Sequence, residues 1–310
     1  MNKKKFENII NTRSVKLAIQ LLVLVVCVVY IYNQIQKVDL SLIEINFIDL
    51  TISFVITAIG TWLGAISWWI TLRVFGQTPP LTKIQEIQFK SNLVKYIPGY
   101  GWQLVGKSYM TTKIGYASNT VIASMLFEFM VILFSGLFIA ALFIPPNFDL
   151  QLPIFTIIIR NRHFLQVLAL VILVGCPHFF QLISSRIPKN KTMPRIDLRW
   201  VMVLVVLLGF TWIVNSVGFS FLFTAVGIQT PISLPYTVFV FTSTFIIGLI
   251  VIIAPGSIGV RESLFIFFLT PVIGGSVAGV IAIVYRIITI FAEVLMATSN
   301  FFYMKIINKE

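Results

Sequence analysis

Residues 253–261 read IAPGSIGVR, an apolar run that Pro-Gly interrupts and an arginine follows at once. A second break of this kind lies in residues 95–107, KYIPGYGWQLVGK, where Pro98 stands 157 positions before Pro255. Proline removes a backbone donor and glycine permits a sharp turn, so each break should end one helix and begin another. Two such breaks in apolar surroundings indicate a membrane protein with a duplicated part.

The composition is that of an integral membrane protein. Of the 310 residues, 58% are hydrophobic and 11% charged, and the mean hydropathy is +0.96, far from the values of soluble domains. The apolar runs are near the length of a spanning helix, and the alternating pattern of a β-barrel is absent. Six full spans are predicted, at about 17–32, 50–72, 117–144, 164–183, 200–226 and 276–304.

Two further stretches suit re-entrant hairpins. Residues 80–113 interleave lysines with apolar side chains around Pro98, which makes them too polar to span and too apolar for an ordinary loop. Residues 235–270 are apolar but broken at Pro255. The predicted fold is therefore an all-α polytopic membrane protein with about six full transmembrane helices and two re-entrant helical hairpins.

The order of these elements predicts one transmembrane domain, residues 1–310, that contains two inverted repeats. Repeat A covers about 50–144 and repeat B about 200–304, with a linking span at 164–183. Each repeat is a span, a hairpin and a span, and the two begin on opposite sides of the membrane. Inverted repeats with broken helices are a recurrent architecture of secondary transporters.

The net charge of +12 reflects topology rather than nucleic-acid binding. Basic residues cluster at the ends of apolar runs, and the cluster in residues 3–16 precedes the first span. The positive-inside rule then places both termini in the cytoplasm, with Arg160 and Arg162 as an exception on the outside. We expect a multi-pass protein of the cell inner membrane.

The helix that restarts after each break should present free N–H groups and a positive dipole end, which attract anions. The alternative interpretation is that each break only forms a tight turn between packed helices and binds no anion. The candidate residues at the two breaks are Pro98, Gly99, Gly101 and Lys107, and Pro255, Gly256, Gly259, Arg261 and Glu262.

Two charged residues lie near the centres of predicted spans, where a charge costs about 3 kcal/mol on insertion scales. These are Glu128 and Arg286, and the 157-residue offset aligns Glu128 with Tyr285, next to Arg286. We expect Glu128 and Arg286 to pair, either as a structural lock or as a gate where a lipid phosphate competes for the arginine. Arg261 and Glu262 could form a local pair with the same two roles.

The chain lacks paired carboxylates at a membrane edge, a nucleophile elbow and a phosphate-cradling loop. No CxxC motif or His/Cys cluster is present either. We therefore expect no enzymatic activity, no metal and no cofactor.

The two Pro-Gly motifs and their surroundings, KYIPGYGWQLVGK and APGSIGVRE, resemble the transmembrane domain of lysylphosphatidylglycerol synthases and of stand-alone flippase-like proteins that share it. The resemblance covers about residues 10–305 and implies an inner-membrane domain that translocates lipids, including aminoacylated phosphatidylglycerol. Related domains also occur with glycosyltransferases of polyisoprenyl-linked sugar pathways. The matching positions are Pro98, Gly99, Gly101, Pro255, Gly256, Gly259, Arg261 and Glu262.

The synthases carry a soluble aminoacyl-transferase domain after the membrane part, and residues up to Glu310 contain none. We therefore do not expect this chain to synthesise lipid, and this departure from the synthases weakens the expectation of a lysyl-lipid substrate.

The resulting hypothesis is a translocase for an anionic phospholipid or a polyisoprenyl-phosphate-linked lipid. Amides after Gly99 and Gly256, with Lys107, Arg261 and Arg286, would hold the phosphate, while Glu128 and Glu262 would balance charge in the empty site. The alternative is a non-transporting integral membrane partner of a glycosyltransferase or lipid-modifying enzyme. The expected partners are anionic membrane lipids and, in the alternative, such an enzyme, without nucleic acid.

Overall fold

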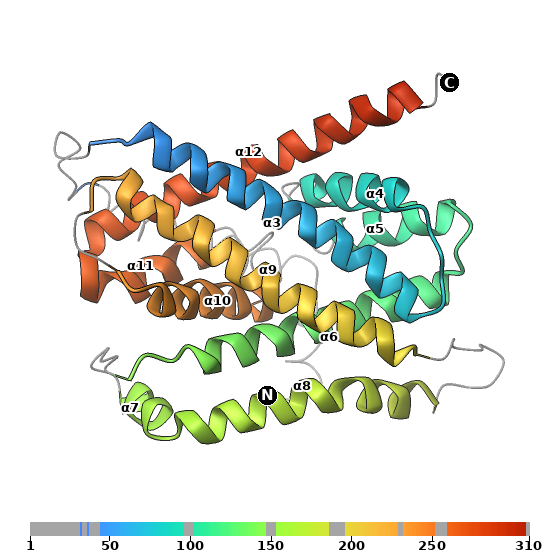
Figure 1. The fold of residues 1–310 in the computed structure, drawn as a ribbon, viewed down its shortest axis with the longest axis horizontal. Coiled ribbons are helices and arrows are strands. Elements are labelled where there is room, and N and C mark those ends of the chain that lie inside the picture. Colours follow the sequence, from blue (N-terminus) through green and yellow to red (C-terminus); the bar gives the residue numbers. More distant parts are fainter. Residues whose placement is uncertain are drawn as a thin grey trace, which may run out of the picture.

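The computed structural model describes residues 32, 36, 44–95, 102–146, 153–185, 196–228, 232–251 and 259–307. Every regular element in these ranges is a helix (Figure 1), so the predicted all-α polytopic fold is confirmed. The helices are α3 (Phe47–Val74), α4 (Leu81–Val94), α5 (Trp102–Lys113), α6 (Ser118–Leu142), α7 (Pro153–Arg160), α8 (Arg162–Ser185), α9 (Leu198–Ala225), α10 (Leu234–Ile250), α11 (Val260–Ile273) and α12 (Gly275–Ile307).

Five helices in the described ranges are long and apolar enough to cross a membrane, and they are α3, α6, α8, α9 and α12. They coincide with five of the six predicted spans. The remaining prediction, residues 17–32, falls outside the described residues except for Tyr32.

The most extensive helix-to-helix contact in the described part of the chain is between α3 and α9, which run in opposite directions (Figure 1). The backbone N–H of Asn46, which caps the start of α3, donates to the carbonyl of Ala225 at the end of α9 (2.9 Å). In the same way the N–H of Asp197, which caps α9, donates to the carbonyl of Val74 at the end of α3 (3.0 Å). The capping residue of each helix thus donates to a carbonyl at the end of the other helix, where helical hydrogen bonding leaves carbonyls without a partner.

The turns after α3 and α9 also match. Gly76 and Gly227 both adopt left-handed backbone angles, with φ of 69° and 80°. The N–H of Gly76 donates to Arg73 (2.9 Å), and the N–H of Gly227 donates to Thr224 (3.1 Å). The two helices therefore end in the same kind of glycine turn and are capped in the same way.

The two predicted hairpins each contain a pair of short neighbouring helices. α4 packs on α5, and α10 packs on α11. α4 has 14 residues and α11 has 14, so each is about 21 Å long and too short for a bilayer core of about 30 Å. The connections that contain Pro98 and Pro255 lie outside the described residues.

Each hairpin packs against the last span of the other half of the chain. α4 contacts α12, and α10 contacts α6. Gly136 permits the second contact, because a Cβ atom at this position would lie 2.3 Å from Cδ1 of Ile246. Figure 1 shows α4 and α10 ending in the middle of the bundle, while α8 lies outside it against α6. This crossed packing brings side chains of both hairpins to the central part of α12.

Candidate functional site

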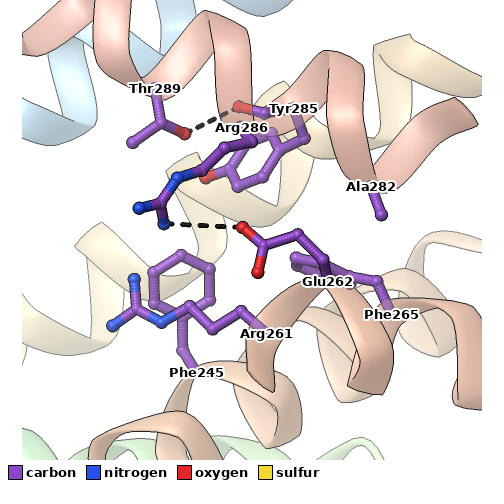
Figure 2. Close-up of a pocket in the computed structure, with 8 residues that line it drawn as sticks. All are labelled: Phe245, Arg261, Glu262, Phe265, Ala282, Tyr285, Arg286 and Thr289. Atoms are coloured by element: carbon purple, nitrogen blue, oxygen red, sulfur yellow. Dashed lines mark hydrogen bonds and ion pairs between the residues drawn. The ribbon is translucent and has the colours of Figure 1, made fainter. Parts of the chain in front are cut away.

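A small pocket lies where α10, α11 and α12 meet (Figure 2). Its floor is aromatic: Phe265 and Tyr285 belong to a ring cluster in which Phe219 stacks on Phe265 with centroids 4.5 Å apart. The lining residues are Phe245 from α10, Arg261, Glu262 and Phe265 from α11, and Ala282, Tyr285, Arg286 and Thr289 from α12. Two arginines and one carboxylate therefore share a small pocket whose other lining residues are aromatic or small.

Arg261 lies over the ring of Phe245, with its guanidinium carbon 4.0 Å from the ring centroid. Its buried Nε atom has no hydrogen-bond partner, and no carboxylate among the described residues forms an ion pair with it. Gly248 makes room for the side chain, because a Cβ atom there would lie 2.9 Å from Cγ of Arg261. Gly248 and Phe245 of α10 thus position the Arg261 side chain, and its Nε donor is left without a partner.

Glu262 has two partners. Its Oε2 accepts from the backbone N–H of Gly259 (2.7 Å), the residue that caps the start of α11 with φ of 82°. Its Oε1 lies 3.5 Å from Nη1 of Arg286 (Figure 2). The carboxylate therefore caps the restarted helix and partly neutralises Arg286. It does not form the expected local pair with Arg261, and it occupies one of the N–H donors that the sequence suggested would bind a phosphate.

Lys95 ends α4, directly before the first break, and forms an ion pair with Glu293 of α12. Glu293 is buried, with 6% of its side chain exposed, while 16% of the Lys95 side chain is exposed. The contact joins the first hairpin to the helix that also carries Arg286. Sequence reasoning missed both residues as site residues, although a carboxylate inside a span is a signal that could have identified Glu293.

Lys107 and Glu128 form a separate, sealed pair. Nζ of Lys107 lies 2.6 Å from Oε2 of Glu128 and 3.9 Å from the ring centroid of Trp68. Only 6% of the lysine side chain and 9% of the glutamate side chain are exposed. Neither residue lines the pocket, so the structure places Lys107 apart from Arg261 and Arg286.

The predicted pair between Glu128 and Arg286 is therefore wrong. Each of these residues pairs instead with the helix that precedes its own span in the chain: Glu128 with α5, and Arg286 with α11. The physical reason is proximity, because α5 packs on α6 and α11 packs on α12. The two halves thus contain equivalent pairs of opposite polarity.

The structure brings Gly259, Arg261, Glu262 and Arg286 together in one place and puts Lys107 and Glu128 in another. The other candidates, Pro98, Gly99, Gly101, Pro255 and Gly256, lie outside the described residues. Sequence reasoning missed Phe245 and Gly248 because nothing in their local pattern distinguishes them from ordinary residues of an apolar helix.

Comparison with known proteins supports the resemblance in the two Pro-Gly motifs. The family model described as the lysylphosphatidylglycerol synthase TM region matches residues 17–297. A search of curated protein sequences finds no match. The match covers the pocket, both hairpins, the spanning helices α3, α6, α8 and α9, and α12 as far as residue 297. The chain belongs to the family of the lysylphosphatidylglycerol synthase transmembrane region.

Proposed function

We propose that this membrane protein is a lipid translocase that moves an anionic phospholipid or a polyisoprenyl-phosphate-linked lipid between leaflets. The observation that carries the proposal is Arg261, a partly buried arginine whose buried Nε has no hydrogen-bond partner, in a pocket that it shares with Arg286. A guanidinium held in this way is a preformed binding group for a phosphate.

The location of the pocket favours transport over binding at the membrane surface. Arg261 and Arg286 lie on helices of the second hairpin and the last span, and the crossed packing places both hairpins against the spans of the opposite half. A headgroup at this pocket would lie inside the bundle, while its hydrocarbon tails remain in lipid. Family membership in a lipid-related membrane region agrees with this interpretation.

The chemistry of the pocket favours binding over catalysis. Apart from the two arginines, its ionisable groups are Glu262, which two partners already occupy, and the phenol of Tyr285. Such a set can bind and release an anion but offers no poised nucleophile or acid–base pair. The proposal is therefore a carrier of lipids without enzymatic activity.

The proposed location is the cell inner membrane, with both termini in the cytoplasm. Arg73 and Arg199 lie at one end of the α3–α9 pair, because Val74 and Asp197 are hydrogen-bonded there. Asp49 lies near the other end, where Asn46 bonds to Ala225. The positive-inside rule assigns the basic end to the cytoplasm.

The test is leaflet exchange in phosphatidylcholine liposomes that contain the purified protein and a trace of a fluorescent lipid. The lipids are NBD-labelled phosphatidylglycerol in one set and a labelled polyprenyl phosphate in another, with membrane-impermeant dithionite as the quencher. We expect the protein to render inner-leaflet lipid accessible. Arg261→Gln should slow exchange by at least about tenfold, because a hydrogen bond to a charged group contributes about 1.5–3 kcal/mol.

Arg160→Gln is the matched control, since it removes one positive charge from an exposed position at the end of α7. It should leave the rate unchanged. Exchange no faster than in protein-free vesicles for both lipids would refute the translocase and favour the non-transporting partner of a lipid-modifying enzyme. Equal rates for the wild type and Arg261→Gln would refute the role of the arginine.

A further inference from the structure

Lys95 comes from the first hairpin but contacts the helix that forms one wall of the pocket. It ends α4, and its ammonium pairs with the carboxylate of Glu293 on α12. The pocket itself contains residues of α10, α11 and α12 only. Lys95 is thus a positive charge that the opposite half of the chain supplies to the same span.

The pocket and the Lys95 pair lie along one face of α12. Arg286, Thr289 and Glu293 follow one another at spacings of three and four residues, which places them on the same side of a helix. Arg286 and Thr289 line the pocket, and Glu293 lies about 10 Å from Arg286 along the helix axis. The ion pair of Lys95 therefore lies just beyond the pocket at its Thr289 end.

Electrostatic interactions connect the same groups. The charges of Arg261 and Arg286 both act on Lys95, and Glu293 acts on Lys95 and Arg261. Together, Lys95, Arg261, Arg286, Glu262 and Glu293 comprise three cations and two carboxylates. This set carries one surplus positive charge, which an anionic headgroup would balance.

The ion pairs of Lys95 and Lys107 differ in how far their side chains are exposed. The Lys95 side chain is 16% exposed and that of Arg286 18%, whereas Lys107, packed on Trp68, is only 6% exposed. The side chain of Lys95 is therefore less enclosed than that of Lys107.

We propose that Lys95 is the third cation of the anion site, and that Glu293 holds it until a lipid phosphate takes its place. The inference rests on the proposed function, because it assumes that an anionic headgroup enters the pocket. It adds that both hairpins contribute to the site. In the empty protein the first hairpin is tied to α12 by this pair, and in the loaded protein the ligand bridges Lys95 to Arg261 and Arg286.

The test is a double-mutant cycle of lipid binding rather than transport. Purified protein in phosphatidylcholine nanodiscs is titrated with short-chain phosphatidic acid, and binding is followed by thermophoresis and by the ligand-induced rise in Tm. Lys95→Met should weaken binding by about tenfold, the loss expected for one charge-assisted contact. Lys95→Arg should restore most of it. Glu293→Gln should strengthen binding by about tenfold, since it removes the internal competitor.

The double variant decides between ligand contact and a structural role. If Glu293 acts by occupying Lys95, Lys95→Met with Glu293→Gln should bind as weakly as Lys95→Met alone. Glu293→Gln should also lower the Tm of the empty protein and give a larger ligand-induced rise in Tm than the wild type, because it removes the carboxylate that pairs with Lys95 until ligand binds. Glu128→Gln in the sealed pair is the matched control and should lower Tm without strengthening binding.

Unchanged or weaker binding in Glu293→Gln would overturn the inference, as would full affinity in Lys95→Met. The proposed function is tested separately in the same assay by Arg261→Gln. If this variant loses affinity while the Lys95 and Glu293 variants do not, only the inference on Lys95 fails. If the wild-type protein does not bind phosphatidic acid, the inference on Lys95 fails, and leaflet exchange of the two labelled lipids decides separately on the proposed function.

Discussion

A Cβ atom at Gly248 would lie 2.9 Å from Cγ and 3.2 Å from Nε of Arg261. The side chain of Arg261 therefore occupies the room that the absence of a side chain at Gly248 leaves on α10. Both distances are shorter than an ordinary van der Waals contact. Any larger residue at this position must therefore displace the arginine or move α10 away from α11. This contact gives a way to move Arg261 without mutating it.

Gly248→Ala should reduce leaflet exchange of an anionic lipid several-fold while the protein stays folded. Alanine favours a helix over glycine by about 1 kcal/mol, which offsets part of the steric cost. The measurement is the exchange rate together with Tm. Gly209→Ala is the control, because no atom lies within 4 Å of a Cβ at that helical position, and it should leave exchange unchanged. Wild-type exchange in Gly248→Ala would show that the position of Arg261 does not matter.

The ion pair of Lys107 and Glu128 should stabilise the folded protein. Glu128→Leu leaves a buried ammonium unpaired and is expected to destabilise the protein by about 3–5 kcal/mol. Lys107→Met combined with Glu128→Leu should recover most of this loss, because both charges are then absent. Thermal unfolding in detergent measures the effect. A Glu128→Leu protein as stable as the wild type would contradict the assignment.

Gly136 should set the distance between α6 and α10. Its absent Cβ would lie 2.3 Å from Cδ1 of Ile246 and 2.9 Å from Cζ2 of Trp212. Gly136→Ala should therefore lower stability by about 1–3 kcal/mol through overpacking. Ile246→Ala should restore stability in the Gly136→Ala background while it destabilises the wild type through a cavity. Additive losses in the double variant would show that the two positions do not pack together.

The two hairpins should open to opposite sides of the membrane. Ile114 follows α5 and Val272 lies near the end of α11, and these residues are 40% and 41% exposed. Single cysteines at these positions, in a chain with Cys27 and Cys176 replaced by alanine, should react with an impermeant maleimide from the cytoplasmic side for Ile114→Cys and from the outside for Val272→Cys. Labelling of both from one side would exclude inverted hairpins.

The sequence predicts the helices well, because long apolar runs leave few alternatives. The span predicted at 200–226 is α9, Leu198–Ala225, and the span predicted at 50–72 is α3, Phe47–Val74. The small differences at the starts come from Asp197 and Asn46, whose side chains cap the helices one residue before they begin. Local side-chain chemistry of this kind shifts a boundary without changing the hydrophobic pattern.

The sequence predicts the ion pairs poorly, because hydropathy says nothing about how each helix is rotated around its axis or which helix it faces. Glu128 and Arg286 are conspicuous as charges inside spans, but their partners are Lys107 and Glu262 on the neighbouring helices. The contact of Lys95 with Glu293 joins residues 198 positions apart and depends on the crossed packing of α4 on α12. A single sequence gives no access to that packing.

The most direct test of the account is charge selectivity in leaflet exchange, measured as the ratio of rates for NBD-labelled phosphatidylglycerol and phosphatidylcholine in the same proteoliposomes. If Arg261 binds the anionic headgroup in the pocket, the wild-type protein should move phosphatidylglycerol faster than phosphatidylcholine, so the ratio of rates should exceed one. Arg261→Gln should bring this ratio close to one. A wild-type ratio equal to one, or a ratio that Arg261→Gln leaves unchanged, would contradict the account.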